Sequence, residues 1–229
     1  MMMSHPSRWR LIRYRNSVYR RIDRQGFKSL KRKYRYDEKK KYLRLEHEIW
    51  KHLHHAAMLN LDGAQPKRIL DVGCGGGMFS VVCEILGHRV TGIDAPSDMY
   101  ADMARVFKVE RVVHTIRAFK SIPELNGPFD LITAFATKFD HRTGEDHSRR
   151  KNGRGLWSAA EWRFFLVDLA RQMKSEGMFF FKLNKHSGGI EKGRILSKDA
   201  EHYFQAIGAK RRLNTICITK KQIEKMENI

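Results

Sequence analysis

Three glycines and two aspartates in the first half of the chain have the types and the spacing of a ligand-binding loop. Asp71 is followed by glycines at alternate positions, Gly73, Gly75 and Gly77. Asp94 comes 21 residues after Gly73. Glycines allow a ligand to approach the main chain, and free N–H groups at the start of a following helix point at it. A carboxylate about 20 residues further on accepts hydrogen bonds from ribose hydroxyls in nucleoside-binding folds. The pattern therefore predicts a nucleoside site.

The elements that position this loop follow the order strand, turn, helix, strand. Residues 69–72 form a short apolar run, which is typical of a strand buried on both faces of a parallel sheet. After the glycines, apolar residues at spacings of three and four predict a helix that ends at Gly87. Residues 89–94 then have the pattern of a second strand, which places Asp94 at its carboxyl end.

The DxGxGxG motif that starts at Asp71 resembles the first motif of class I S-adenosylmethionine-dependent methyltransferases. Its rival is the dinucleotide fingerprint GxGxxG, which occurs in the same strand–turn–helix context. That fingerprint, started at Gly73, needs glycine or alanine where the chain has Met78. A carboxylate such as Asp71 also suits a cationic aminoacyl ligand better than a pyrophosphate. The resemblance covers about residues 66–219 and implies a Rossmann-like, doubly wound α/β fold with a mostly parallel sheet.

The resemblance also implies S-adenosyl-L-methionine as the cofactor and a set of residues around it. Asp94 matches the position that holds the adenosine ribose, and residues 95–99 would border the ribose and the adenine. The family often has an acidic residue at the adenine amine, where this chain has Ala118 and Phe119. A main-chain group at Ala118, with Phe119 against the ring, would replace it. Phe135 ends the expected fourth strand, beside the methyl group. The expected cofactor-binding residues are Asp71, Gly73, Cys74, Gly75, Gly77, Asp94, Ala95, Met99, Ala118, Phe119 and Phe135.

Further strands are expected at residues 111–118, 129–135 and 178–184 from their apolar runs. Residues 211–219 are expected to form one long strand or a tight hairpin. The family usually ends with two antiparallel strands here, but the pattern is only about one strand long. The edge of the sheet is therefore expected to be abbreviated. Serine N-caps predict the starts of three helices, at Ser97, Ser158 and Ser197.

The acceptor half of the site is less clearly marked. Asp140 and His141 follow the fourth strand and are candidates for the base that takes a proton from the acceptor, unless they are solvated loop residues. Residues 142–155 have the composition of a flexible substrate loop. Lys182, inside the apolar fifth strand, matches one element of the Lys-Asp-Lys-Glu set of RNA ribose 2′-O-methyltransferases. The alternative is a lysine whose stem packs while its amine reaches the strand end.

Two signatures of nucleic-acid methylation do not occur in the sequence. One is an Asn/Asp-Pro-Pro-aromatic motif, which serves methylation of exocyclic base amines or glutamine amides. The other is a Pro-Cys nucleophile, which serves carbon-5 methylation of pyrimidines. Their absence from the sequence favours a small-molecule acceptor.

The basic charge of the chain is uneven. The formal net charge is +20, and residues 1–51 hold 17 Lys and Arg against 5 Asp and Glu. Such an excess favours a polyanion as partner, and the aromatic residues among the cations of residues 1–36 would suit nucleic acid. The alternative, which we favour, is an amphipathic helical arm whose apolar residues pack on the domain. We expect a basic, largely helical extension over residues 1–62 and the methyltransferase domain over residues 66–229.

Cysteine and histidine spacings predict neither disulfides nor a metal site. Three cysteines without a CxxC pair fit a reducing compartment. His52, His54 and His55 have no carboxylate or cysteine at ligand spacing, so exposed histidines and no metal are expected. The apolar runs are far shorter than the ~20 residues that span a membrane. The N-terminus lacks the apolar core of a secretory signal, although its Arg-rich start up to Asp23 leaves a transit peptide open. Cytoplasm is the expected location.

Three functions follow from these patterns. The first is a methyltransferase that moves a methyl group from S-adenosylmethionine to an O or N atom of a small molecule. The second is an RNA methyltransferase that uses the basic arm. The third is a non-catalytic nucleic-acid-binding protein on the same fold.

Overall fold

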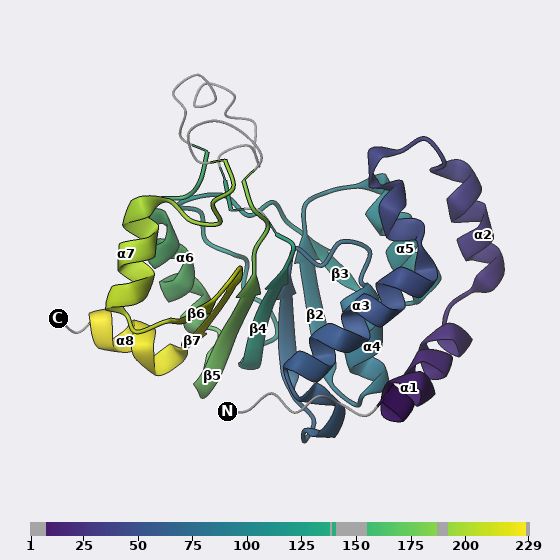
Figure 1. The fold of residues 1–229 in the computed structure, drawn as a ribbon, viewed down its shortest axis with the longest axis horizontal. Coiled ribbons are helices and arrows are strands. Elements are labelled where there is room, and N and C mark those ends of the chain that lie inside the picture. Colours follow the sequence, from purple (N-terminus) through teal and green to yellow (C-terminus); the bar gives the residue numbers. More distant parts are fainter. Residues whose placement is uncertain (1–7, 138, 141–154, 187–191, 228–229) are drawn as a thin grey trace.

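A central sheet with helices on both faces forms the body of the protein (Figure 1). The computed structural model describes residues 8–137, 139–140, 155–186 and 192–227. The strands are β1 (Arg68–Val72), β2 (Arg89–Asp94), β3 (Arg111–Val113), β4 (Phe129–Phe135), β5 (Met173–Lys182), β6 (Lys210–Arg212) and β7 (Thr215–Thr219). The α-helices are α1 (Arg8–Arg21), α2 (Arg24–Lys33), α3 (Leu45–Met58), α4 (Met78–Ile85), α5 (Asp98–Phe107), α6 (Ala159–Ala170), α7 (Lys198–Ala206) and α8 (Lys220–Glu227). Two 3-10 helices are η1 (Glu38–Leu43) and η2 (Leu61–Gly63).

The strand order is β3-β2-β1-β4-β5-β7-β6. Strands β1 to β5 pair in parallel, whereas β7 runs antiparallel to both β5 and β6. The predicted doubly wound, mostly parallel sheet is therefore confirmed. Parallel strands place their carboxyl ends at one edge of the sheet, where ligands of such folds bind.

The expectation of an abbreviated sheet edge is wrong. Residues 210–219 form a tight hairpin of β6 and β7 that turns at Leu213, whose φ is +53°. All three residues of β6 are exposed and basic, so this strand has no apolar pattern that sequence reasoning could detect. Strand β3 is shorter than expected because its neighbour β2 ends at Asp94, the partner of Val113.

Both faces of the sheet are buried because side chains alternate along each strand. Ile69 and Phe180 belong to a core cluster with apolar residues of α1 to α5. Leu70 and Phe179, their neighbours in the chain, belong to the cluster on the other face, with residues of α6 to α8. Figure 1 shows the two groups of helices on opposite sides of the sheet. This arrangement explains why the strands have continuous apolar runs.

The N-terminal arm packs on the domain, as expected. Val18, Ile22, Phe27 and Leu30 are buried in the cluster that also contains Phe107 of α5. The Phe27 and Phe107 rings stack with their centroids 6.1 Å apart. Among the described residues, ion pairs join the arm to α4 and α5, at Arg21–Glu84 and Lys33–Asp102, and Arg15 pairs with Glu46 of α3. Part of the basic charge thus serves to dock the arm. The division into an extension and a domain at residues 62–66 stays a prediction.

The expected serine caps are all present. The hydroxyls of Ser97, Ser158 and Ser197 accept hydrogen bonds from the first turns of α5, α6 and α7. At α6 the Glu161 side chain also accepts from the N–H of Ser158, which completes a capping box. Within the described ranges, no helix has the length and apolar character that crossing a membrane requires.

Candidate functional site

The loop between β1 and α4 is pressed against its neighbours. Gly73, Gly75 and Gly77 have φ angles of +75°, +56° and +87°. A Cβ atom on Gly73 would lie 2.4 Å from Thr137 Oγ1, and one on Gly77 would lie 2.4 Å from Val109 Cγ2. Glycine is therefore required here both for the backbone conformation and for the close approach of the flanking segments.

Asp94 joins the end of β2 to this loop. Its Oδ2 accepts a hydrogen bond from the N–H of Gly75 at 2.6 Å, and its Oδ1 accepts one from the N–H of Ala95 at 2.7 Å. Arg111 Nη2 donates to the carbonyl oxygens of Asp94 and Ala95, at 3.2 and 2.5 Å, and so fixes the turn. A carboxylate has about four acceptor positions, so Asp94 can still accept hydrogen bonds from a ligand.

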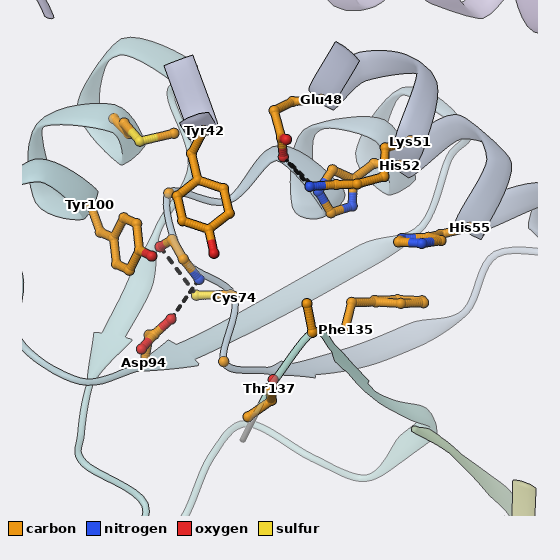
Figure 2. A pocket seen from close by; sticks show the side chains of 15 residues that line it. Tyr42, Glu48, Lys51, His52, His55, Cys74, Asp94, Tyr100, Phe135 and Thr137 are labelled. Carbon is orange, nitrogen blue, oxygen red and sulfur yellow. Dashed lines mark hydrogen bonds and ion pairs between the residues drawn. The ribbon is translucent and has the colours of Figure 1, made fainter. Parts of the chain in front are cut away.

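A cavity of about 260 Å³ lies above this loop, at the carboxyl ends of the strands (Figure 2). The loop contributes Gly73, Cys74, Gly75 and Gly76 to its lining, and the ends of β2 and β4 contribute Asp94, Phe135, Ala136 and Thr137. Helix α5 adds Tyr100 and Met103. The remaining residues come from the segment before β1: Tyr42, Glu48, Lys51, His52 and His55.

Helix α3 covers the cavity with a polar face. Glu48, Lys51, His52 and His55 are three, four and seven residues apart, so they lie along one side of the helix, and Figure 2 shows them above the cavity. The expectation of exposed histidines is wrong for His55, which is 5% exposed, and for His52, whose side chain is 13% exposed. His54, which points away from this face, is exposed as expected.

His52 is paired with a carboxylate on its own helix. Its Nε2 lies 3.5 Å from Glu48 Oε2, and the same oxygen forms an ion pair with Lys51. Burial lowers the pKa of His52 below its ordinary value, although the Glu48 carboxylate acts against this effect. The Nδ1 atom of His52 is buried and has no hydrogen-bond partner in the part of the chain that the structure describes.

His55 is held between an aromatic ring and a lysine. Its ring stacks on Phe135 with the centroids 4.1 Å apart and the planes 4° from parallel. Its Nε2 lies 3.4 Å from the Nζ of Lys182 at the end of β5. Burial lowers the pKa of His55 to about 2, and nearby cations add to this effect. Its Nδ1 is also buried without a partner among the described residues.

Asp71 lies outside the cavity lining. It is 3% exposed, and its Oδ1 accepts a hydrogen bond from Thr133 Oγ1 at 2.9 Å. Burial raises the pKa of Asp71 to about 7. The first aspartate of the motif is therefore a buried group at the end of β1, and the second one, Asp94, lines the cavity.

The structure brings only part of the expected set together. Five of the predicted residues line the cavity: Gly73, Cys74, Gly75, Asp94 and Phe135. Gly77 is the N-cap residue of α4, and Met99 of α5 is buried in the core cluster. Ala118 and Phe119 do not line the cavity, and Phe119 is half exposed with its ring 5.9 Å from that of Phe164.

Of the two candidate bases, the structure describes only Asp140, which lies apart from this cavity. Asp140 is buried, with its Oδ2 3.6 Å from His186 Nδ1, and is not part of the lining. His141 and most of the expected substrate loop, residues 142–154, lie outside the described residues. Within the described ranges, no group of three or more His, Cys, Asp or Glu side chains could hold a metal ion.

Sequence reasoning missed the contribution of α3. The signal was present, because four polar or charged residues share one face of a helix whose other positions include buried Ile49 and Leu53. A polar helix face is usually assigned to solvent, and nothing local says that this one covers a cavity.

Comparisons with known proteins agree with the geometry. A family model described as "Methyltransferase domain" matches residues 42–137. The chain is 38% identical over 82 residues to a ubiquinone biosynthesis O-methyltransferase of Xanthomonas campestris pv. campestris, covering 34% of this chain and 33% of that protein. It is 34% identical over 112 residues to the protein of the same name from Aromatoleum aromaticum. That match covers 42% of this chain and 47% of the relative.

These matches are partial. The chain spans between a third and a half of the length of the curated relatives it matches. Among solved structures, a S-adenosylmethionine-bound amino pentose methyltransferase from Micromonospora echinaspora is similar over 58% of this chain and 50% of that one, with a TM-score of 0.42 and 20% identity. At that score the likeness supports no conclusion of its own, and the fold assignment rests on the strand order and register.

Proposed function

Because the chain belongs to the class I S-adenosylmethionine-dependent methyltransferase family, we propose that it binds S-adenosylmethionine in the cavity above the glycine loop and transfers the methyl group to an O or N atom of a small molecule. The observation that carries the proposal is the meeting of Gly73, Gly75 and Asp94 in one cavity at the carboxyl ends of the parallel strands.

The residues present fit this cofactor. Asp94 would accept hydrogen bonds from the ribose hydroxyls, and the glycine loop leaves main-chain atoms open to the ligand. The ammonium of Lys51 would pair with the carboxylate of the methionine part, at the other end of the cavity. When bound, S-adenosylmethionine supplies an electrophilic methyl group. Much of the rate would then come from alignment of an acceptor beside Phe135, because the chain has little covalent chemistry to perform.

Two observations support a small-molecule acceptor. The curated relatives are named as ubiquinone biosynthesis O-methyltransferases, and the sequence lacks the motifs of base and amide methylation. The acceptor site would lie under α3, whose polar face covers the cavity.

Isothermal titration of S-adenosylhomocysteine into the wild type, Asp94→Asn and Asp98→Asn tests the cofactor site. Asp98 is an exposed residue four positions on, so its replacement is a matched control. Hydrogen bonds to charged groups contribute about 1.5–3 kcal/mol, so Asp94→Asn should weaken binding by about 10- to 100-fold. Asp98→Asn should bind like the wild type. Absence of binding to the wild type, or equal binding by all three proteins, would refute the proposed site.

A second candidate function, RNA methylation, is favoured by one observation on α2 and the residues after it. Five cations there are exposed and have no carboxylate partner among the described residues; they are Arg24, Lys28, Lys31, Arg32 and Arg35. Tyr36 beside them is 82% exposed. A row of free cations with an exposed ring can bind a single-stranded nucleic acid.

A further inference from the structure

His52 and His55, which both line the cavity, carry ring nitrogens of opposite hydrogen-bonding character. The Nε2 of His52 faces the Glu48 carboxylate, which can only accept, so the proton of the neutral ring lies on Nε2 and Nδ1 has a free lone pair. The Nε2 of His55 faces the ammonium of Lys182, which can only donate. The ring of His55 therefore accepts through Nε2 and carries its proton on Nδ1.

Both Nδ1 atoms need a partner that the described chain does not supply. Each is buried and without a hydrogen bond among the described residues, and both residues line the cavity. A buried polar atom without a partner is costly, so such atoms in a cavity point to a ligand group that satisfies them. The two ring centroids are 5.3 Å apart. Their planes are 84° apart, so the two imidazoles are neighbours in the lining of one cavity.

We propose that His52 and His55 hold the hydroxyl group of the methyl acceptor, with Nδ1 of His52 as the general base and the Nδ1–H of His55 as a donor to the hydroxyl oxygen. The inference rests on the proposed function and narrows its acceptor to an oxygen nucleophile. A hydroxyl matches this pair because it donates one hydrogen bond and accepts another. The proposal replaces Asp140 and His141 as the source of the base.

The reaction balances with this assignment. The hydroxyl oxygen forms its bond to the methyl carbon while the bond from that carbon to the donor sulfur breaks. The sulfur keeps the electron pair and becomes a neutral thioether, and the hydroxyl proton passes to Nδ1 of His52. Glu48 is a positioning residue, because it holds the tautomer and favours the cation that forms on the ring.

The surroundings of His52 keep it neutral and able to accept a proton. The groups that act on its charge among the described residues are Glu48, Lys51 and His47, all from α3, with His55 beside it. The rings packed on it from α4 and β4, those of Phe79 and Phe135, carry no charge. Lys182 of β5 acts on His55. Burial outweighs the Glu48 carboxylate and lowers the pKa of His52.

Nitrogen NMR of ¹⁵N-histidine-labelled protein tests the pair without knowledge of the natural acceptor. The spectra should show an unprotonated Nδ1 for His52 and a protonated Nδ1 for His55. Assignment uses His52→Gln and His55→Gln. Addition of 3,4-dihydroxybenzoate, a small aromatic diol, to the complex with S-adenosylhomocysteine should shift both Nδ1 signals. The reverse tautomers, or Nδ1 signals that the diol leaves unchanged, would overturn the proposal.

Methyl transfer from S-adenosylmethionine to the same diol gives a second readout, on the wild type, His52→Gln, Glu48→Gln and the control His54→Gln. A general base contributes about 10²–10⁴-fold, so His52→Gln should lower kcat by at least about 100-fold while S-adenosylhomocysteine still binds. His54→Gln, which changes an exposed residue of the same helix, should keep the wild-type rate. Glu48→Gln should move the rising limb of the pH–rate profile to lower pH, because the lost carboxylate no longer favours protonated His52.

These measurements distinguish a wrong role for the histidine pair from a wrong cofactor site. His52→Gln with the wild-type rate and pH profile would overturn the histidine pair. Transfer by the wild type to 3,4-diaminobenzoate in preference to the diol would overturn the oxygen acceptor. Failure of the wild type to bind S-adenosylhomocysteine would instead refute the proposed function itself.

Discussion

Replacing Asp71 with asparagine should remove a pH dependence from the stability of the protein. Asp71 is buried at the end of β1, and this burial raises its pKa from 3.8 to about 7. The carboxyl group thus keeps its proton in the folded protein at pH values where the unfolded chain has lost it. At about 1.4 kcal/mol per pH unit, the difference corresponds to about 4 kcal/mol of lost stability at high pH.

The sign follows from proton binding. Between pH 3.8 and about 7 the folded state binds more protons at this site than the unfolded state, so the free energy of unfolding falls as pH rises. Stability from this group is complete below pH 3.8 and is lost as pH rises through about 7. About 2 kcal/mol of the loss should fall between about pH 5 and pH 7.

Urea unfolding of the wild type and Asp71→Asn at several pH values between about 5 and 9 measures this effect. Asparagine is neutral throughout and keeps an oxygen that can accept from the Thr133 hydroxyl. Other titrating groups, including His55, are present in both proteins and cancel in the difference. The wild type should lose about 2 kcal/mol relative to the variant between about pH 5 and pH 7. If the free energy of unfolding of the wild type minus that of the variant stays constant or rises with pH, the argument that burial dominates at Asp71 is refuted.

Two further predictions concern the glycine loop and the arm. Gly77→Ala should destabilise the protein more than Gly87→Ala in urea unfolding. Both glycines have a positive φ, which costs an alanine about 1–2 kcal/mol, and only at Gly77 would the added Cβ also clash with Val109. Equal losses of stability would contradict the tight packing at Gly77. If α2 binds RNA, the affinity for poly(U) should fall as salt is added. The logarithm of the binding constant should fall by about 0.7 per tenfold increase in salt for each phosphate contact, and a variant with glutamines in α2 should show a smaller slope. A variant with glutamines in β6 is the control, and an unchanged slope in the α2 variant would contradict the arm as the binding surface. The glutamine substitutions are at Arg24, Lys28 and Lys31 in α2 and at Arg35 just after it, and in the control at Lys210, Arg211 and Arg212 in β6.

The meeting of the glycine loop and Asp94 was predictable because its signals are local. The glycine loop, both flanking strands and Asp94 lie within about one strand–helix–strand unit, and chain geometry alone brings them together. The adenine contact was harder, since it depends on the residues after β3, where pairing ends at Val113. Ala118 and Phe119, the residues expected at the adenine, do not line the cavity.

The proposed acceptor side of the cavity was not predictable because it is assembled from distant segments. His55 meets Lys182 across 127 positions of sequence, and His52 meets Phe135 across more than 80. Before folding, the polar face of α3 cannot be distinguished from a solvated one. The short strand β6 was expected only as part of one alternative, the tight hairpin, because its three residues are exposed and carry no periodic pattern.

The glycine loop and the face of α3 differ in how freely their residues can change. Gly73 and Gly77 are constrained by contacts that leave no room for a side chain, and Asp94 is fixed by hydrogen bonds from the N–H groups of Gly75 and Ala95. The face of α3 is not constrained in this way: its lining positions contact the cavity, while its buried apolar positions hold the helix on the sheet. Replacing a lining residue such as His52 alters its contacts with the Phe79 and Phe135 rings but leaves the buried apolar positions of α3 unchanged. We infer that acceptor chemistry is determined by α3 and the ends of β4 and β5, and that the cofactor loop is compatible with many acceptors.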